Sequence, residues 1–294
     1  MNVLITGAAR GIGAASARGL AAQGHRLALV GLEPEALEAV AASCGNGAFA
    51  LEADVTDDEA IRRAVDEAAS GLGGLDAVVV NAGIATQGVL RHVETDRFAQ
   101  QIDVNLVGTF RTVHAAVPHL VERRGYLLIV ASVAAIVHGP VLGAYTASKA
   151  GTEALADSLR VELKHLGIDV GCGYFSWIDT DMVRGGDEAP AFRRLRESMK
   201  PPFHKTYPVD AAADAIVAGV QQRKRIVVAP RWVRALLPLR ALVQRVAERD
   251  SRAVMPELER IDAADRAQRG ELAHAPVGAG GDAVTLPASR APAG

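Results

Sequence analysis

The sequence predicts an α/β protein built on one doubly wound parallel sheet. From Asn2 to about Pro230, short apolar runs alternate with longer amphipathic stretches. Several of these runs are apolar throughout, as strands are when both faces of a parallel sheet are covered. The first run leads directly into a glycine-rich turn that opens an amphipathic stretch. This strand–helix–strand repetition is typical of doubly wound sheets.

The elements are expected in a regular order along the chain. The strand candidates are 3–6, 26–30, 49–52, 77–81, 126–131, 169–174 and 225–228. Helices are expected at 12–23, 34–43 and 58–72, with longer ones at 103–120 and 145–163. Right-handed crossovers place such helices on both faces of the sheet. Because ligands of these sheets bind beyond the carboxyl ends of the strands, the chemistry is expected in the loops that follow them.

The chain changes character after Pro230, which predicts that one domain covers residues 1–230. Apolar residues at helical spacing predict a helical C-terminal extension over 231–274, in which Pro238 would introduce a kink. Residues 275–294 are rich in Gly, Ala and Pro and are expected to form a disordered tail. The extension should dock on the body or on a neighbouring subunit. It could instead lie on an anionic membrane, but Pro238 and the acids that follow argue against this.

The composition excludes several classes of function. Of the 294 residues, 49% are hydrophobic and 22% are charged, which is ordinary for a globular enzyme, and the net charge of −2 gives no reason to expect a nucleic acid. Cys44 and Cys172 are far apart and lack metal-ligand spacing, so we expect no metal and a reducing compartment. The N-terminus has no targeting pattern, and no apolar run reaches the about 20 residues that span a bilayer. We therefore expect a cytoplasmic protein.

The turn after the first strand has the glycine spacing of a dinucleotide-binding loop. It reads Thr6-Gly7-Ala8-Ala9-Arg10-Gly11-Ile12-Gly13. Gly7 permits a sharp turn, Gly11 lets the backbone approach a pyrophosphate, and Gly13 allows close packing of helix on strand. The phosphate then meets the free N–H groups around Ile12 and the positive end of the helix dipole. An ordinary strand–helix turn is the alternative, but the position after the first strand favours cofactor binding.

The second strand ends without the acid that selects NAD. An acid there would bond the adenosine ribose hydroxyls, but the position holds Gly31, and Glu33 could substitute only if the loop bends differently. Arg10 in the glycine loop could pair with the 2′-phosphate of NADP, or it could be a solvated loop residue. These observations favour NADP(H) over NAD(H).

Two further loops are expected on the cofactor side of the sheet. Asp54-Val55 follows the third strand, where a carboxylate can accept a hydrogen bond from the adenine amino group. A role in capping the next helix is the alternative for this segment, and both can hold. Asn81-Ala82-Gly83 follows the fourth strand and is small enough to leave room for the adenosine, although it could be an ordinary turn at the sheet end.

A serine, a tyrosine and a lysine form the candidate catalytic group. Ser132 follows the fifth strand, and Tyr145 and Lys149 share one face of the next helix. A free tyrosine has a pKa of about 10, which a nearby ammonium lowers. Tyr145 then becomes an acid for a carbonyl oxygen, or a base in reverse, while Ser132 donates a hydrogen bond to that oxygen. On spacing alone this pair is a weak signal.

Taken together, these motifs resemble the short-chain dehydrogenase/reductase family over about residues 1–230. The resemblance implies a Rossmann-type fold, a nicotinamide cofactor and hydride transfer between a carbonyl and an alcohol. It implies that Tyr145 is the acid/base and that Lys149 binds the nicotinamide ribose. It also implies that Asn105 holds a water in a proton relay, although Asn105 could be purely structural. Ile178 and Thr180 match positions that contact the nicotinamide amide, but the Pro-Gly that the family usually carries there is missing.

The substrate is expected to be an apolar ketone or secondary alcohol. His138, Leu142 and Trp177 are the candidate contacts, and Trp177 could instead pack in the core. Residues 181–207 either form a mobile lid or a surface helix with an ordinary apolar face. The helices at 103–120 and 145–163 resemble those through which the family forms homodimers and homotetramers. A non-catalytic dinucleotide-binding sensor on the same fold is the alternative function.

Overall fold

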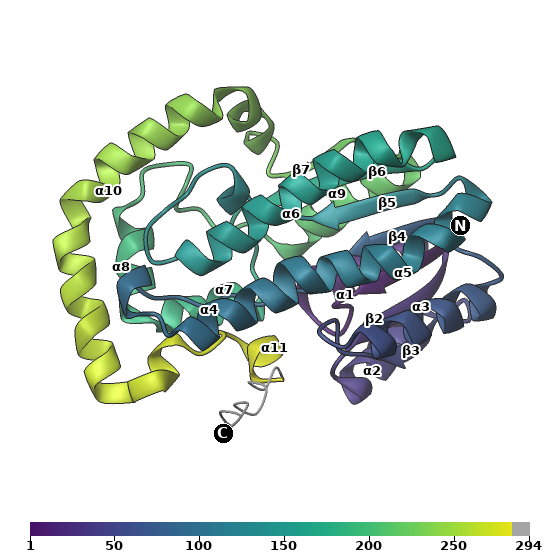
Figure 1. The fold of residues 1–294 in the computed structure, drawn as a ribbon, viewed down its shortest axis with the longest axis horizontal. Helices are drawn as coiled ribbons and strands as arrows, with labels where there is room; N and C mark the ends of the chain where they lie inside the picture. Colours follow the sequence, from purple (N-terminus) through teal and green to yellow (C-terminus); the bar gives the residue numbers. More distant parts are fainter. Residues whose placement is uncertain (284–294) are drawn as a thin grey trace, which may run out of the picture.

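The sheet of the protein is parallel throughout and has the expected strands. The computed structural model describes residues 1–283, and within them the strand order is β3-β2-β1-β4-β5-β6-β7 (Figure 1). The strands are β1 Asn2–Thr6, β2 Arg26–Gly31, β3 Phe49–Glu52, β4 Ala77–Val80, β5 Tyr126–Val130, β6 Asp169–Phe175 and β7 Ile226–Ala229. Each lies within one residue of its expected bounds. The order reverses between β1 and β4, which confirms a doubly wound sheet.

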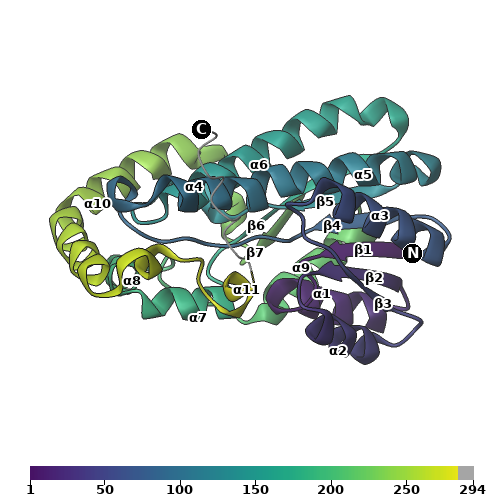
Figure 2. The same ribbon diagram turned by 60° about the horizontal axis from the view of Figure 1, so that its bottom comes forward.

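Two apolar layers hold helices on the two faces of the sheet. One face packs on α1 Gly11–Ala22, α2 Pro34–Cys44 and α9 Val209–Gln221, and the other on α3 Asp58–Leu72, α5 Gly108–Arg123 and α6 Gly143–Glu162. Figure 2 shows these groups below and above the strands. Side chains of β1, β4 and β5 are buried on both faces, as their uninterrupted apolar sequences predicted.

The helix expected at 103–120 begins differently from the prediction. A short helix, α4 Thr95–Ile102, leads into a π-helical turn at Asp103–Val107, and α5 begins at Gly108. π-helical turns inside longer helices often mark functional sites. Here the turn carries Asn105.

Two helices lie within residues 181–207, for which the sequence allowed either a mobile lid or a surface helix. They are α7 Asp181–Glu188 and α8 Pro190–Ser198. Phe192 and Leu195 of α8 are buried against Trp177 and against side chains of the C-terminal extension. The apolar spacing therefore marks a packed helix face.

The C-terminal extension is one long helix, α10 Val233–Arg269, which curves around one end of the molecule (Figure 1). Pro238 and Pro256 lie inside it, so Pro238 does not divide the extension. Pro238 stands in the second turn, where the carbonyl group left without a donor belongs to exposed Arg234. No helix of residues 1–283 is long and apolar enough to cross a membrane.

The first part of the expected disordered tail is instead ordered. After the 3₁₀ turn Gly270–His274, the chain returns to the body and forms α11 Ala279–Asp282 beside α7. The N–H of Val277 donates to the carbonyl of Ala85 at 2.9 Å, which anchors the segment. The sequence signal failed here because this contact depends on a partner almost 200 residues away. The remainder of the expected tail, 284–294, lies outside the described residues.

Candidate active site

The turn between β1 and α1 has a geometry that only glycine permits at two positions. Gly7 has a φ of +63°, and a Cβ there would lie 2.8 Å from the Cα of Ala82. A Cβ on Gly13 would lie 2.1 Å from the carbonyl oxygen of Gly7. The close packing expected of Gly13 is confirmed, and the turn leaves no space for a side chain at either position.

Asn81 joins this turn to the loop after β4. Its Nδ2 donates to the carbonyl oxygens of Thr6 and Gly7, both at 3.1 Å. In return, the hydroxyl of Thr6 accepts hydrogen bonds from the N–H groups of Asn81 and Ala82 at 3.1 and 3.2 Å. The two loops therefore form one hydrogen-bonded unit at the point where the strand order reverses, which is where doubly wound sheets bind their ligands.

The first turn of α1 fits a phosphate group. The helix begins at Gly11, and its N-cap residue Arg10 makes no side-chain capping bond. The N–H groups of Ile12 and its neighbours thus have no side-chain cap, and they point outward with the positive end of the helix dipole. Together with the space left by Gly7 and Gly13, this donor set suits the pyrophosphate of a dinucleotide.

Arg10 faces the carboxylate of Glu33, which the sequence allowed at the cofactor site only if the loop bends differently. The Nε of Arg10 donates to the Oε1 of Glu33 at 2.5 Å, and the two side chains are 44% and 20% exposed. Glu33 is the N-cap residue of α2 and follows Gly31 by two positions. The loop thus bends in the way that brings a carboxylate beside Arg10. The preference for NADP(H) assumed that no acid lay there, and this pair weakens that assumption.

In the loop after β3, the capping role considered for residues 54–57 falls on Asp57. The carboxylate of Asp57 accepts hydrogen bonds from the N–H groups of Glu59 and Ala60, which lower its pKa and cap α3. Asp54 instead accepts from the N–H of Thr56 at 2.8 Å and shapes the preceding turn. Val55 is buried against Gly108, where a Cβ would lie 2.7 Å from its Cγ2. Asp54 keeps its position at the carboxyl end of β3.

Ser132, Tyr145 and Lys149 come together where β5 ends and α6 begins. The Ser132 hydroxyl faces Tyr145 closely enough to lower the pKa of the phenol, and both side chains line the same cavity. Lys149 is 4% exposed, and its Nζ lies 5.9 Å from the centre of the Tyr145 ring. The same Nζ donates to the carbonyl of Val130 at 2.9 Å. The structure therefore assembles the three side chains that the sequence singled out.

The pKa values of this group differ from the expectation. Burial raises the pKa of Tyr145, and the hydrogen bond from Ser132 only partly offsets it. Burial also lowers the pKa of Lys149 to about 8. The expected lowering of the tyrosine pKa by the ammonium is not found here: burial is the largest cause of the shift, and Lys149 is not among its causes. Tyr145 remains protonated at neutral pH, which is the form that donates a proton.

Asn105 connects three parts of the site through its side-chain amide. Its Oδ1 accepts from the N–H of Ile84 at 2.8 Å, and its Nδ2 donates to the carbonyl of Ile84 at 2.9 Å and to Ser148 Oγ at 3.0 Å. A Cβ on Gly83 would lie 3.1 Å from this Oδ1 and 3.5 Å from the Nζ of Lys149. Asn105 is fully buried. Its side chain thus has a bracing role beside Lys149, and the water relay stays a prediction.

The loop after β6 reaches the start of α1 without the Pro-Gly pair. Ile178 is buried and pairs with Tyr207 in a parallel bridge. The Oγ1 of Thr180 donates to the carbonyl of Ile178 at 3.3 Å. A Cβ on Gly11 would lie 3.2 Å from the Cγ2 of Thr180. Thr180 therefore lies against the glycine turn, and both Ile178 and Thr180 line the cavity, where contact with a nicotinamide was expected.

A cavity of about 850 Å³ lies next to the catalytic group, and most of its lining is apolar. Tyr145, Ser132 and Lys149 belong to its wall. The rest comes from loops after β4, β5 and β6, from α8 and the loop behind it, and from residues 243–253 of α10. Clefts of this size and lining are typical of small-molecule sites.

The expected substrate contacts divide into two that meet the cavity and one that does not. Leu142 and Trp177 line it, and Trp177 also packs edge-on against Phe192, so both of its open roles hold. His138 is exposed and outside the lining, and its N–H donates to Gln244 Oε1 at 2.8 Å. The prediction for His138 is wrong because the loop turns that residue toward α10.

Gln87 is a cavity residue that the sequence did not point to. Its side chain is 4% exposed and lines the cavity, and its Oε1 has no hydrogen-bond partner among the described residues. The one signal for it was its position four residues after Gly83. The contribution of α10 had no signal, because nothing local in the sequence tells where the extension returns.

Comparison with known proteins agrees with this site. Residues 1–190 match the family described as short chain dehydrogenase. The protein belongs to the short-chain dehydrogenase family. The family match and the parallel sheet together confirm the predicted fold class and the oxidoreductase class.

Relatives with a printed activity are reductases and dehydrogenases. The 3-oxoacyl-[acyl-carrier-protein] reductase MabA of Mycobacterium avium is 34% identical over 188 residues, which cover 64% of this chain and 71% of that protein. An 11-beta-hydroxysteroid dehydrogenase of Pinus massoniana is 30% identical over 250 residues, 82% and 70% of the two chains. The structure of levodione reductase has a TM-score of 0.72 at 26% identity and covers 79% of this chain and 97% of its own.

Proposed function

We propose that the protein transfers a hydride between a nicotinamide cofactor and an apolar ketone or secondary alcohol, with Tyr145 as the acid/base. The observation that carries this proposal is that Ser132, Tyr145 and Lys149 lie together on the wall of a largely apolar cavity, with the Lys149 Nζ 5.9 Å from the centre of the Tyr145 ring. The glycine turn and the start of α1 lie at the same edge of the sheet. An acid and a dinucleotide site thus serve one cavity.

The chain's own residues account for the proton and the orientation. When bound, the nicotinamide supplies the hydride in reduction and accepts it in oxidation. In reduction, the carbonyl π bond breaks, a C–H bond forms, and the hydroxyl of Tyr145 donates its proton to the oxygen. Ser132 donates a hydrogen bond to that oxygen and stabilises its developing charge. The ammonium of Lys149 stabilises the phenolate that remains.

The apolar character of the cavity supports the substrate class. Trp177, Phe192 and Leu142 contribute large apolar surfaces, and Met199 and Phe203 add to them. Burial of apolar substrate surface here contributes about 25 cal/mol per Å². Relatives include reductases of an acyl thioester-borne ketone and a steroid dehydrogenase, by their printed names. This similarity supports a ketone with a sizeable apolar body.

The choice of cofactor depends on the Arg10–Glu33 pair. We propose NADP(H), with Arg10 leaving Glu33 to pair bidentately with the 2′-phosphate. The carboxylate of Glu33 opposes this choice, because it would repel the phosphate and could instead bond ribose hydroxyls. Titration with NADPH and NADH separates the two outcomes, and tighter binding of NADH would overturn the preference.

The proposed activity is tested with a carbonyl panel after the cofactor titration. We expect cofactor oxidation with apolar ketones such as 2-decanone or cyclohexanone, and no turnover of charged sugars. If the protein binds either cofactor but turns over no member of a broad ketone and alcohol panel, the non-catalytic sensor replaces the enzyme. The cytoplasmic location expected from the sequence stays a prediction.

The homo-oligomer is also part of this proposal. Phe110 on α5 and Val161 on α6 are 51% and 79% exposed, on the two helices expected to form the interface. Exposed apolar side chains on such helices support association between copies of the chain. Sedimentation at micromolar concentration should give a dimer or tetramer, and a monomer would contradict the proposal.

A further inference from the structure

The C-terminal extension forms part of the substrate cavity rather than a separate appendage. Side chains between residues 243 and 253 of α10 line the cavity, and so do side chains of α8. Further along α10, Val254 and Leu258 are buried against Phe192 and Leu195 of α8. Any substrate that fills the cavity therefore meets α10. The position of α10 determines how much space a substrate has.

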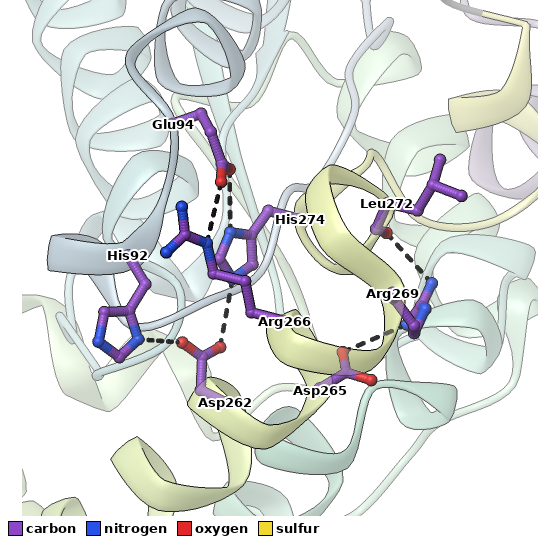
Figure 3. Close-up of polar contacts among 8 residues, drawn as sticks. All are labelled: His92, Glu94, Asp262, Asp265, Arg266, Arg269, Leu272 and His274. Carbon is purple, nitrogen blue, oxygen red and sulfur yellow. Dashed lines mark hydrogen bonds and ion pairs between the residues drawn. The ribbon is translucent and has the colours of Figure 1, made fainter.

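A buried cluster of charged side chains holds the far end of this extension (Figure 3). The ring of His274 lies between two carboxylates, with Nδ1 3.1 Å from Glu94 Oε2 and Nε2 3.4 Å from Asp262 Oδ1. The other oxygen of Asp262 lies 2.7 Å from His92 Nδ1, and Arg266 donates to Glu94 at 3.2 Å. The His274 and Asp262 side chains are only 1% and 6% exposed. The cluster joins α10 and the turn after it to the segment that leads into α4.

The same cluster touches the loop that follows the Asn81-Ala82-Gly83 motif. A Cβ on Gly88 would lie 2.5 Å from the His274 ring, so the histidine packs directly on this glycine. Gly88 in turn pairs with Leu142 and donates its N–H to the carbonyl of Val141 at 2.9 Å. Leu142 lines the cavity, and so do Ala85 and Gln87, which precede Gly88 in the same loop. Gly88 thus lies between His274 and the cavity-lining Leu142.

We propose that the Glu94–His274–Asp262–His92 cluster is a latch that holds the extension closed over the substrate cavity and so selects substrates by size. Asp262 and His274 are positioning residues in this account, since they act through α10 and the loop at 84–88. The inference rests on the proposed function for the meaning of the cavity, but the latch itself is a property of the described contacts. It assigns to the extension a role in substrate selection.

The two carboxylates and His274 shift one another's pKa values within the latch. The hydrogen bond with Asp262 raises the pKa of His274, against the effect of burial, and Glu94 adds to the rise. Burial acts to raise the pKa of Asp262, but hydrogen bonds from His274 and His92 outweigh it and lower that pKa. For Glu94 the bonds from its own backbone and from His274 likewise outweigh burial. The other charged side chains at this contact are Arg266, Arg91 and Glu259.

These shifts give the latch a direction with pH. A histidine whose folded pKa is raised contributes stability that is complete below its unfolded pKa of about 6.5 and is lost as the pH rises through its folded value. The lowered pKa values of Asp262 and Glu94 keep both carboxylates charged well into the acid range. The latch should therefore be closed at pH 6 and weaken on the alkaline side.

Hydrogen exchange of the full-length protein with saturating cofactor tests the latch itself. Asp262→Asn should raise exchange at least about tenfold, or about 1.4 kcal/mol of opening free energy, in residues 254–274 and in 84–92. Peptides from β1 and α3 should not change. Glu248→Gln is the matched control, because Glu248 is exposed on the same helix and, within residues 1–283, bonds only Gln244 of that helix. Equal exchange in Asp262→Asn and Glu248→Gln would overturn the latch. If Asp262→Asn does not fold, His92→Gln and the wild type at pH 6 and pH 9 give the same comparison.

Steady-state kinetics with 2-butanone and 2-decanone test the link to substrate size. In Asp262→Asn we expect the KM for 2-decanone to change by about fivefold or more, with kcat and the KM for 2-butanone unchanged. In the wild type, the ratio of the KM for 2-decanone to the KM for 2-butanone should change in the same way between pH 6 and pH 9, and this ratio is unaffected by a common effect of Lys149 titration on both substrates. Altered exchange with an unchanged KM for 2-decanone would overturn the role in substrate selection. Absence of turnover in the wild type would count against the proposed function, while the exchange result would still decide the latch.

Discussion

The two ends of the site are built in different ways. At the cofactor end, the side chains of Thr6 and Asn81 join the loops after β1 and β4, and the critical positions are glycines. At the substrate end, the walls come from segments 83–87, 130–142, 175–203 and 243–253, and aromatic contacts and ion pairs hold side chains of these segments and of the extension. The cofactor end depends on glycines that leave space beside the backbone, and the substrate end depends on contacts between side chains.

This difference explains how each end should respond to change. In the glycine turn, the atoms nearest to a Cβ added at Gly7 or Gly13 belong to the backbone of Ala82 and Gly7, so a single added methyl group displaces the main chain. A wall of side chains can repack, and substitutions there should alter selectivity before they alter folding.

Gly13→Ala should break the cofactor end most severely. The new Cβ would lie 2.1 Å from the carbonyl oxygen of Gly7, so the turn must open. We expect NAD(P)H affinity to fall at least about 100-fold, or about 2.7 kcal/mol, in a fluorescence titration. Gly280→Ala is the control, because no atom lies within 4 Å of a Cβ at that position. Near-normal binding by Gly13→Ala would show that the turn is less rigid than its contacts imply.

Lys149→Met should stabilise the cofactor-free protein, although it removes a catalytic group. Burial lowers the pKa of Lys149 to about 8, so below that pH the folded state holds a buried ammonium at a cost. We expect the free energy of unfolding at pH 7 to rise by about 2 kcal/mol in urea titrations. Between about pH 8 and 10.5 the unfolded wild type binds more protons than the folded wild type. The stability of the wild type should therefore rise with pH over this range, and the stability gained by Lys149→Met should shrink. A less stable variant at pH 7, with exposed Lys205→Met unchanged, would contradict this account.

Neutralising either side chain of the Arg10–Glu33 pair should shift the cofactor preference, by a smaller amount than the effects of the two preceding variants. Glu33→Gln removes the carboxylate that competes for Arg10, so the ratio of NADPH to NADH affinity should rise about tenfold. Arg10→Gln should lower the same ratio. Dissociation constants for both cofactors measure the effect. Unchanged ratios in both variants would exclude this pair from cofactor selection.

The sequence predicted the local features of the molecule well. All seven strands and the glycine turn could be placed because apolar runs and glycine positions report local geometry directly. Ser132, Tyr145 and Lys149 could be found because two of them share a helix turn and the third follows a strand. The raised pKa of Tyr145 could not be foreseen, since it depends on burial by distant segments.

The features that the sequence missed are long-range. His274 meets Glu94 across 180 residues, and no periodicity connects the two. The part of the tail that packs at Val277 looked disordered because Gly, Ala and Pro dominate its composition. His138 looked like a substrate contact because it lies between two catalytic residues, but its own N–H bonds Gln244 of α10 while its loop neighbours line the cavity. These errors arose where the extension meets the body.

Tyr145→Phe in the presence of the preferred cofactor tests the central claim most directly. The substitution removes one hydroxyl and leaves the ring, Lys149 and the glycine turn in place. The account predicts that the dissociation constant for the cofactor stays within about twofold of the wild type. Turnover of the best ketone should fall by about 10²–10⁴-fold, the range attributed to general acid catalysis. Wild-type turnover by Tyr145→Phe would contradict the assignment of Tyr145 as the proton donor.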